Sequence, residues 1–274
     1  MAGATEEQLR TEKRTWERPS VFYRSEFKWA LYALILVFLL WSAWSLRVSV
    51  ERFLLGLEGM EVLVSEMLRP DFSERNRALI YEGVLESLAM SIVATVLGVA
   101  ISIPIAFMAA RNLAPAPVYA VGRGLITISR SFHELIIAII AVKAFGIGAF
   151  AGVVTLVFGT VGFYSKLLAE DIEDIEDAQI NAVRVTGASR LQVLLYGVIP
   201  QVLPRIVGLT VYRWDINIRV STIVGIVGAG GIGATLMTTF QTYDFDFASA
   251  IIIVIIALVL FGELVSAITR RRVS

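Results

Sequence analysis

One apolar stretch contains four charged or polar residues whose types and spacing suit ion pairing or the binding of an anion. The segment 212–219 holds Arg213, Asp215, Asn217 and Arg219 at alternating positions. Because Arg219 follows Asp215 by four residues, a helix places both on one face, where they can pair. A guanidinium also matches a tetrahedral oxyanion with two parallel hydrogen bonds, which an ammonium does not. The segment therefore predicts either an internal ion pair or a path for an anion, and both interpretations stay open.

A second polar cluster, Arg130–Glu134, interrupts another apolar stretch. Its His133 and Glu134 are of types that can act as general acid and base. His133 is the single histidine and the chain has no cysteine, so the several ligands that a metal site requires are not indicated. We predict no catalytic residue and no metal site here, and interpret the cluster as a hydrogen-bonded core or as part of a transport pathway.

The run Gly228–Gly233 matches the pattern G-x-G-x-x-G. A dinucleotide site would need a strand before this run and a soluble βαβ unit around it. An apolar stretch of helical length precedes it instead. We therefore predict a glycine-rich turn at the outer end of a membrane span, where glycine permits tight turns and close helix contacts.

ATP hydrolysis by this chain is not indicated. The sequence contains no G-x-x-x-x-G-K-[ST] segment, which is the phosphate-binding loop of many ATPases. None of the four lysines follows a glycine: Lys13, Lys28, Lys143 and Lys166. We predict that the chain is not an enzyme, and that any ATPase acting with it is a separate subunit.

The elements that carry these residues are apolar enough to cross a membrane. Hydrophobic residues make up 57% of the 274 residues, charged residues 18%, and the mean hydropathy is +0.74. A bilayer core requires about 20 apolar residues per helix. We therefore predict an all-α polytopic membrane protein with about six spans. A net charge of zero gives no indication of nucleic acid binding. The predicted spans are 29–46, 84–110, 125–145, 149–169, 205–226 and 248–268.

The basic residues predict the orientation of the spans. They gather in the N-terminal segment, in the connections after the second and fourth spans, and at the C-terminus, whereas 146–148 and 227–247 have none. The loop 47–83 has five arginines, but its acidic residues outnumber them. By the positive-inside rule both termini are predicted to be cytoplasmic. The 28 mostly polar residues before the first span, with no cleavage signal after it, predict a retained helix. The basic residues are Arg10, Lys13, Arg14, Arg18, Arg24, Lys28, Arg111, Arg123, Arg184, Arg190, Arg270, Arg271 and Arg272.

The predicted cytoplasmic loop at about 170–200 has the pattern of two helices joined by a glycine. An apolar stripe at helical spacing, from Ile172 to Val185, leads to Gly187. Ser189 and Gln192 have the spacing of a capping box for a second helix, and Pro200 is predicted to end it. A short, folded, amphipathic loop on the cytoplasmic side suggests docking to another protein.

This loop resembles the coupling loop of ABC importer permeases. That pattern reads Glu-Ala-Ala, three residues, Gly, nine residues, Ile-x-Leu-Pro, and Ala182, Gly187 and Pro200 stand at its spacing. Asn181 replaces the glutamate. Across roughly 80–268 the chain resembles the phosphonate ABC transporter permease. This resemblance is carried by Ala106–Leu113, by 182–204 ending Ile-Pro-Gln-Val-Leu-Pro, by Tyr212–Arg219, and by Gly225–Gly233.

The resemblance implies a type I importer fold and an arrangement of partners. A binding protein would deliver phosphonate, phosphite or phosphate to two permease chains, as a homodimer, in the cell inner membrane. Two ATPase subunits would bind ATP and Mg²⁺ and contact Asn181, Ala182, Arg184 and Gly187. Arg213, Asp215, Asn217 and Arg219 match the family element of the translocation region, to which His133 and Glu134 are added.

Two other functions are kept open, a polytopic membrane enzyme and a membrane scaffold without transport. The predicted organisation is a cytoplasmic segment 1–28, a first helix with an outer loop 29–80, and a permease core 81–274. We see no inverted repeat of the kind found in many secondary transporters.

Overall fold

The computed structural model describes residues 25–46 and 49–273, and all regular structure within these ranges is helical. Most N-terminal basic residues used above for orientation, Arg10, Lys13, Arg14, Arg18 and Arg24, lie outside the described residues, as does Ser274. The helices are α1 (Ser25–Ser45), α2 (Val50–Met67), α3 (Glu74–Ala109), α4 (Ala116–Ser131), α5 (Glu134–Phe145), α6 (Ala149–Glu173), α7 (Asp177–Val185), α8 (Arg190–Val193), α9 (Ile199–Gly225), α10 (Ile232–Gln241) and α11 (Phe245–Val273).

Five of these helices are long and apolar enough to cross a membrane, and a sixth span results if the bent pair α4 and α5 counts as one. This agrees with the predicted number of spans. The segment 47–83, predicted as an outer loop, holds the helix α2, which the sequence pattern did not predict. The chain divides into two compact units, Met1–Glu61 and Val62–Ser274.

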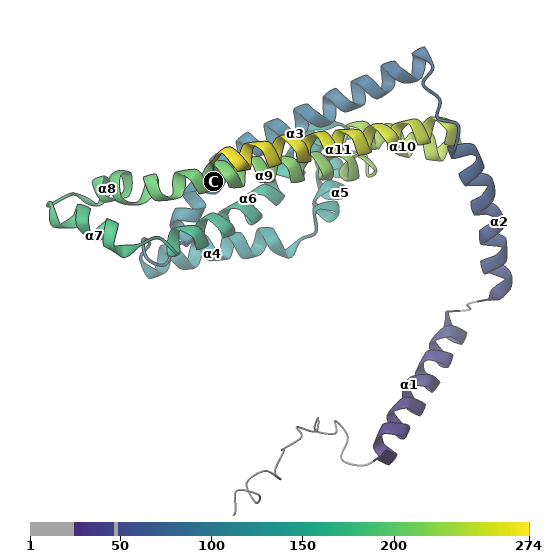
Figure 1. The fold of residues 1–274 in the computed structure, drawn as a ribbon, viewed down its shortest axis with the longest axis horizontal. Coiled ribbons are helices and arrows are strands. Elements are labelled where there is room, and N and C mark those ends of the chain that lie inside the picture. The colour runs from purple at the N-terminus through teal and green to yellow at the C-terminus, as the bar shows by residue number, and fades with distance from the viewer. Residues whose placement is uncertain (1–24, 47–48, 274) are drawn as a thin grey trace, which may run out of the picture. The chain divides into compact units, whose positions relative to one another are not determined.

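The second unit is built around α3, α6 and α9, which pack against one another (Figure 1). Helix α3 turns a row of small residues toward α6, among them Thr95, Gly98 and Ser102. A Cβ atom at Gly98 would lie 2.5 Å from Thr160 Cγ2, so the two backbones approach closely only because position 98 is glycine. Small residues are the usual means by which membrane helices pack tightly.

The predicted span 125–145 is not one helix. The chain bends by 87° between α4 and α5, at Phe132 and His133, and the pair forms a broken span or a re-entrant loop. His133 begins the new helix as its N-cap, because its Nδ1 accepts a hydrogen bond from the Leu135 N–H at 3.2 Å. The polar cluster 130–134 therefore marks a break in the span, whereas the prediction ran the helix through it.

Two predictions about the loop at 170–200 also need correction. The apolar stripe does not lie on one helix, because α6 ends at Glu173 and α7 begins at Asp177. Pro200 does not end the second helix either. Proline has no N–H to donate to the residue four positions earlier. The chain makes a π-helical turn at Leu194–Val198, where Ile199 N–H bonds to Leu194 C=O, and continues directly into α9.

The glycine-rich run 228–233 forms the predicted tight turn, here between α9 and α10. Gly228, Gly230 and Gly231 have φ of +91°, +79° and +72°, which favour glycine. The turn is fixed to α3, because Glu86 Oε2 accepts the Gly231 N–H at 2.8 Å and Ser87 Oγ accepts the Ile232 N–H at 2.9 Å. The observed role of these glycines is structural.

Candidate functional site

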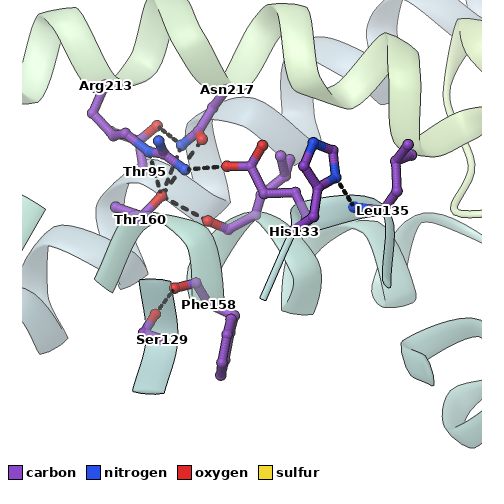
Figure 2. A network of polar contacts seen from close by, with 10 residues as sticks. Thr95, Ser129, His133, Leu135, Phe158, Thr160, Arg213 and Asn217 are labelled. Atoms are coloured by element: carbon purple, nitrogen blue, oxygen red, sulfur yellow. Dashed lines mark hydrogen bonds and ion pairs between the residues drawn. The ribbon is translucent and has the colours of Figure 1, made fainter. Parts of the chain in front are cut away.

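Arg213 is at the centre of a buried polar network that joins four helices. Its guanidinium donates from Nη2 to Glu134 Oε1 at 3.2 Å and from Nε to Thr160 Oγ1 at 3.0 Å. Asn217, one turn along α9, donates to Thr95 at 2.8 Å and to Thr160 at 3.2 Å (Figure 2). Only 2% of Arg213 is exposed. This arginine therefore ties α9 to α5 and α6, and its burial leaves no surface to which an anion could bind.

The network depends on Gly159 of α6. A Cβ atom there would come within 2.7 Å of Glu134 Oε1 and 3.0 Å of Arg213 Nη2. Sequence reasoning singled out Arg213, Glu134 and Asn217 but missed Thr95, Thr160 and Gly159. These three lie on α3 and α6, far from the others in sequence, and small residues in apolar helices carry no local signal of a polar partner.

His133 and Glu134 lie side by side at the break but have different roles. The imidazole is exposed, and its Nδ1 accepts the Leu135 N–H. The neutral ring therefore carries its proton on Nε2, which is left as a hydrogen-bond donor. The Glu134 side chain is 31% exposed and is engaged by Arg213. The two residues do not form an acid–base pair with each other in the structure.

Asp215 and Arg219 form the predicted ion pair on a second face of α9. Arg219 Nη2 lies 2.6 Å from Asp215 Oδ2. The Asp215 side chain is 4% exposed, whereas that of Arg219 is 46% exposed. Asp215 Oδ1 is buried with no hydrogen-bond partner among the described residues. The pair thus presents one accessible guanidinium held by a buried carboxylate.

The helix–glycine–helix pattern at 170–200 is present as a protruding hairpin of α7 and α8 (Figure 1). Gly187 has φ of +80°, and the predicted capping box is formed, with Gln192 Oε1 accepting the Ser189 N–H at 2.8 Å and Ser189 Oγ accepting the Gln192 N–H at 3.4 Å. Asn181 accepts a long hydrogen bond of 3.5 Å from Arg184. The hairpin exposes the apolar side chains of Val185 and Leu191, and the π-helical turn after it exposes Tyr196. A tip with exposed apolar residues is suited to docking against another protein.

One arginine holds the base of this hairpin. Arg123 of α4 donates to both carboxylate oxygens of Glu173, at 2.9 and 3.0 Å, and to the Ala109 C=O at 2.9 Å. The Arg111 N–H donates to Glu173 as well, at 2.7 Å. The C-terminal end of α3 and the middle of α4 therefore meet at Glu173, the last residue of α6.

The comparisons with known proteins agree with this architecture. Residues 102–274 match the family described as binding-protein-dependent transport system inner membrane component. The chain is 42% identical over 217 residues to the phosphite transport system permease protein PtxC of Stutzerimonas stutzeri, covering 79% of this chain and 78% of that protein. It is 39% identical over 211 residues to the phosphate-import permease protein PhnE of Mycolicibacterium smegmatis, covering 77% of this chain and 40% of that protein.

Among solved structures, a chain of the inward-facing MetNI methionine ABC transporter matches with a TM-score of 0.66 at 24% identity. The match covers 74% of this chain and 100% of that one. At this identity the likeness concerns the fold. The predicted all-α fold of a type I ABC importer permease is confirmed.

Proposed function

Because this chain belongs to the family of binding-protein-dependent transport system inner membrane components, we propose that it is the permease subunit of an ABC importer for phosphonate-type oxyanions. The substrate is phosphonate, phosphite or phosphate, delivered by a substrate-binding protein. The observation that carries this substrate class is the 42% identity to a phosphite permease over 79% of the chain. The energy comes from a separate ATPase subunit, which binds ATP and Mg²⁺.

We assign the α7–α8 hairpin as the element that couples the permease to the ATPase. The proposed contact residues are Asn181, Ala182, Arg184 and Gly187. In support, the hairpin protrudes, its turn is fixed by a capping box, and its tip exposes apolar side chains. This assignment requires the hairpin and both chain termini to be cytoplasmic, as the distribution of basic residues predicts.

In the proposed pathway, the polar residues of α9 and those at the break between α4 and α5 have different roles. Arg219 is its accessible cation and attracts the anion, while Asp215 holds the guanidinium in place. His133 and Glu134 line the pathway at the break. Arg213 and Asn217 support it from behind, because both are buried and fully engaged with neighbouring helices. A path that binds the anion weakly at several points allows both entry and release.

The proposed assembly contains two permease chains, an ATPase dimer and one binding protein in the cell inner membrane. The second permease chain is a copy of this one. A membrane enzyme is less well supported, since Glu134 is engaged by Arg213 and His133 caps the first turn of α5. A scaffold without transport leaves the accessible arginine of α9 without a role.

Transport by the reconstituted complex tests this function. The chain is co-expressed with its cognate ATPase and binding protein, placed in liposomes, and supplied with ATP on the ATPase side. Uptake of labelled phosphite, phosphate and methylphosphonate is compared with uptake of methionine. We expect ATP-dependent uptake of at least one of the anions and none of methionine. Uptake of methionine alone would refute the substrate class and leave the permease fold standing.

A further inference from the structure

The break between α4 and α5, at Phe132 and His133, lies within the membrane part of the chain, and it is exposed together with Arg130 and Ser131, the last two residues of α4. Its depth follows from Arg213, which lies about halfway along α9 and pairs with Glu134 beside the break. Non-helical backbone at this depth is found where it is buried in protein or lines a water-filled space, and not against lipid. The exposed side of the break therefore faces water or protein.

Arg130 is the cation at this break, and it has no ion pair or side-chain hydrogen bond to any residue that the structure describes. The other two arginines in the middle of the bundle are both paired, Arg213 with Glu134 and Arg219 with Asp215. An unpaired charge inside a membrane protein is costly and usually marks an ion or substrate path.

The stem of Arg130 is held in place while its charged end is free. A Cβ atom at Gly162 of α6 would lie 3.0 Å from Arg130 Cγ. The aliphatic part of the Arg130 side chain therefore packs against α6 at a position that has no side chain of its own. The preceding residue, Ser129, is buried and donates its hydroxyl to the Phe158 C=O at 2.7 Å (Figure 2). These two contacts with α6 therefore fix where the Arg130 side chain leaves α4.

The local charge balance is positive. Glu134 is the nearest carboxylate in sequence, and it is already neutralised by Arg213. The pair Asp215 and Arg219 is neutral as well, so the charge of Arg130 is left over. A guanidinium can take two oxygens of a tetrahedral anion at once. The Nε2 donor of His133 lies in the same segment.

We propose that Arg130 is a second anion-attracting residue of the transport pathway, at the break between α4 and α5. It forms a station for a phosphonate-type oxyanion distinct from Arg219. This inference rests on the proposed function and adds a residue and a place along the path to it. Two separated cations allow the anion to pass from one to the next without being held tightly.

Charge restoration at a cysteine tests the proposal, because the chain has no cysteine of its own. The variant Arg130→Cys is reconstituted with the ATPase and binding protein, and uptake of phosphite and methylphosphonate is measured. We expect uptake to fall by about tenfold or more, since a charge-assisted contact is lost. Reaction with a methanethiosulfonate that attaches an ethylammonium group should restore a large part of the uptake, and one that attaches a sulfonatoethyl group should not.

Two control chains are treated in parallel. The cysteine-free chain reports any effect of the reagents on the other subunits, and Lys143→Cys reports loss of a different exposed cation, near the end of α5. Neither should change uptake more than about twofold, a free-energy effect of less than half a kcal/mol. Uptake by Arg130→Cys within the same range, or equal effects of the two reagents on it, would overturn the proposal.

The variant Arg130→Lys distinguishes a loss of folding from a loss of anion binding. This variant keeps the charge and loses the fork, so it should accumulate normally and show a raised KM for phosphite with unchanged ATP hydrolysis. Loss of Arg130→Cys from the membrane together with unaltered kinetics of Arg130→Lys would assign Arg130 a structural role instead. An unmodified complex that transports none of phosphite, phosphate and methylphosphonate refutes the proposed function, whereas anion uptake that does not depend on Arg130 refutes this inference alone.

Discussion

Arg213 and Asp215 lie two residues apart on α9, yet their side chains contact different helices. Arg213 pairs with Glu134 of α5, and Asp215 Oδ1 lies 3.3 Å from where a Cβ atom would stand on Gly262 of α11. A two-residue step on a helix turns the direction of a side chain by about 200°. The two acidic partners therefore serve separate sites, and the two arginines of this segment can be tested independently.

Variants of Asp215 and Arg219 distinguish a structural role of this ion pair from a role in transport. If Arg219 attracts the anion, Arg219→Gln abolishes uptake at normal protein levels, and Arg219→Gln with Asp215→Asn stays inactive although it folds. Arg219→Lys keeps partial uptake, because the charge remains and the fork is lost. Asp215→Asn alone is expected to fold, since the Arg219 side chain is 46% exposed and is not buried without a partner.

Recovery of transport in the double variant would contradict the pathway role of Arg219. In that case each single change is harmful only because it leaves an unpaired charge in the bundle, a cost of a few kcal/mol. Membrane levels of all four variants and uptake of phosphite are the measurements, with Lys143→Gln as an exposed charge change outside the proposed pathway.

Gly159→Ala is expected to destabilise the protein by roughly 1–3 kcal/mol, as overpacking of a close contact does. The added methyl group would stand within 2.7 Å of Glu134 Oε1 and must push the carboxylate or its arginine aside. The matched control is Gly208→Ala on α9, where a Cβ atom meets nothing within 4 Å. Thermal unfolding in detergent should show a lowered Tm for Gly159→Ala alone. Equal Tm values for the two variants would show that the ion pair tolerates movement.

Gly187→Val should lower transport and weaken association with the ATPase, without loss of the chain from the membrane. Its φ of +80° costs a side-chain-bearing residue about 1–2 kcal/mol, and a β-branched residue most of all. A Cβ atom at this position meets nothing within 4 Å, so any effect comes from the backbone and not from a clash. Gly187→Asn is the control, because asparagine tolerates the left-handed conformation.

The measurements for Gly187 are substrate-stimulated ATP hydrolysis and co-purification of the ATPase. Both should fall in Gly187→Val and persist in Gly187→Asn. Normal stimulation in the valine variant would remove the hairpin from its proposed role as the coupling element.

The orientation can be tested with single cysteines, since the natural chain provides a clean background. Thr242→Cys, at the end of α10, should react with an impermeant thiol reagent in intact cells. Asn181→Cys, on the hairpin, should react only after lysis. Labelling of position 181 from outside would reverse the topology and exclude contact between the hairpin and a cytoplasmic ATPase.

The features predictable from sequence were those set by near neighbours along the chain. The spans, the pair of Asp215 with Arg219 and the capping box of Ser189 with Gln192 each depend on residues a few positions apart. The partner of Arg213 is 79 residues away, and no spacing rule reaches that far. The bend at Phe132 had a signal, a polar cluster within an apolar stretch, but hydropathy averaged over a window cannot distinguish a polar residue inside a helix from a break.

The two connections of the α7–α8 hairpin to the bundle differ mechanically. On one side the chain turns between Glu173 and Asp177, which makes a joint. On the other side Leu191–Gly225 is a single helix of 35 residues, with the π-helical turn inside it. At 1.5 Å per residue this rod is about 50 Å long. We therefore expect a push at the hairpin to be carried along α9, past Arg213 and Arg219, to the glycine turn at its far end.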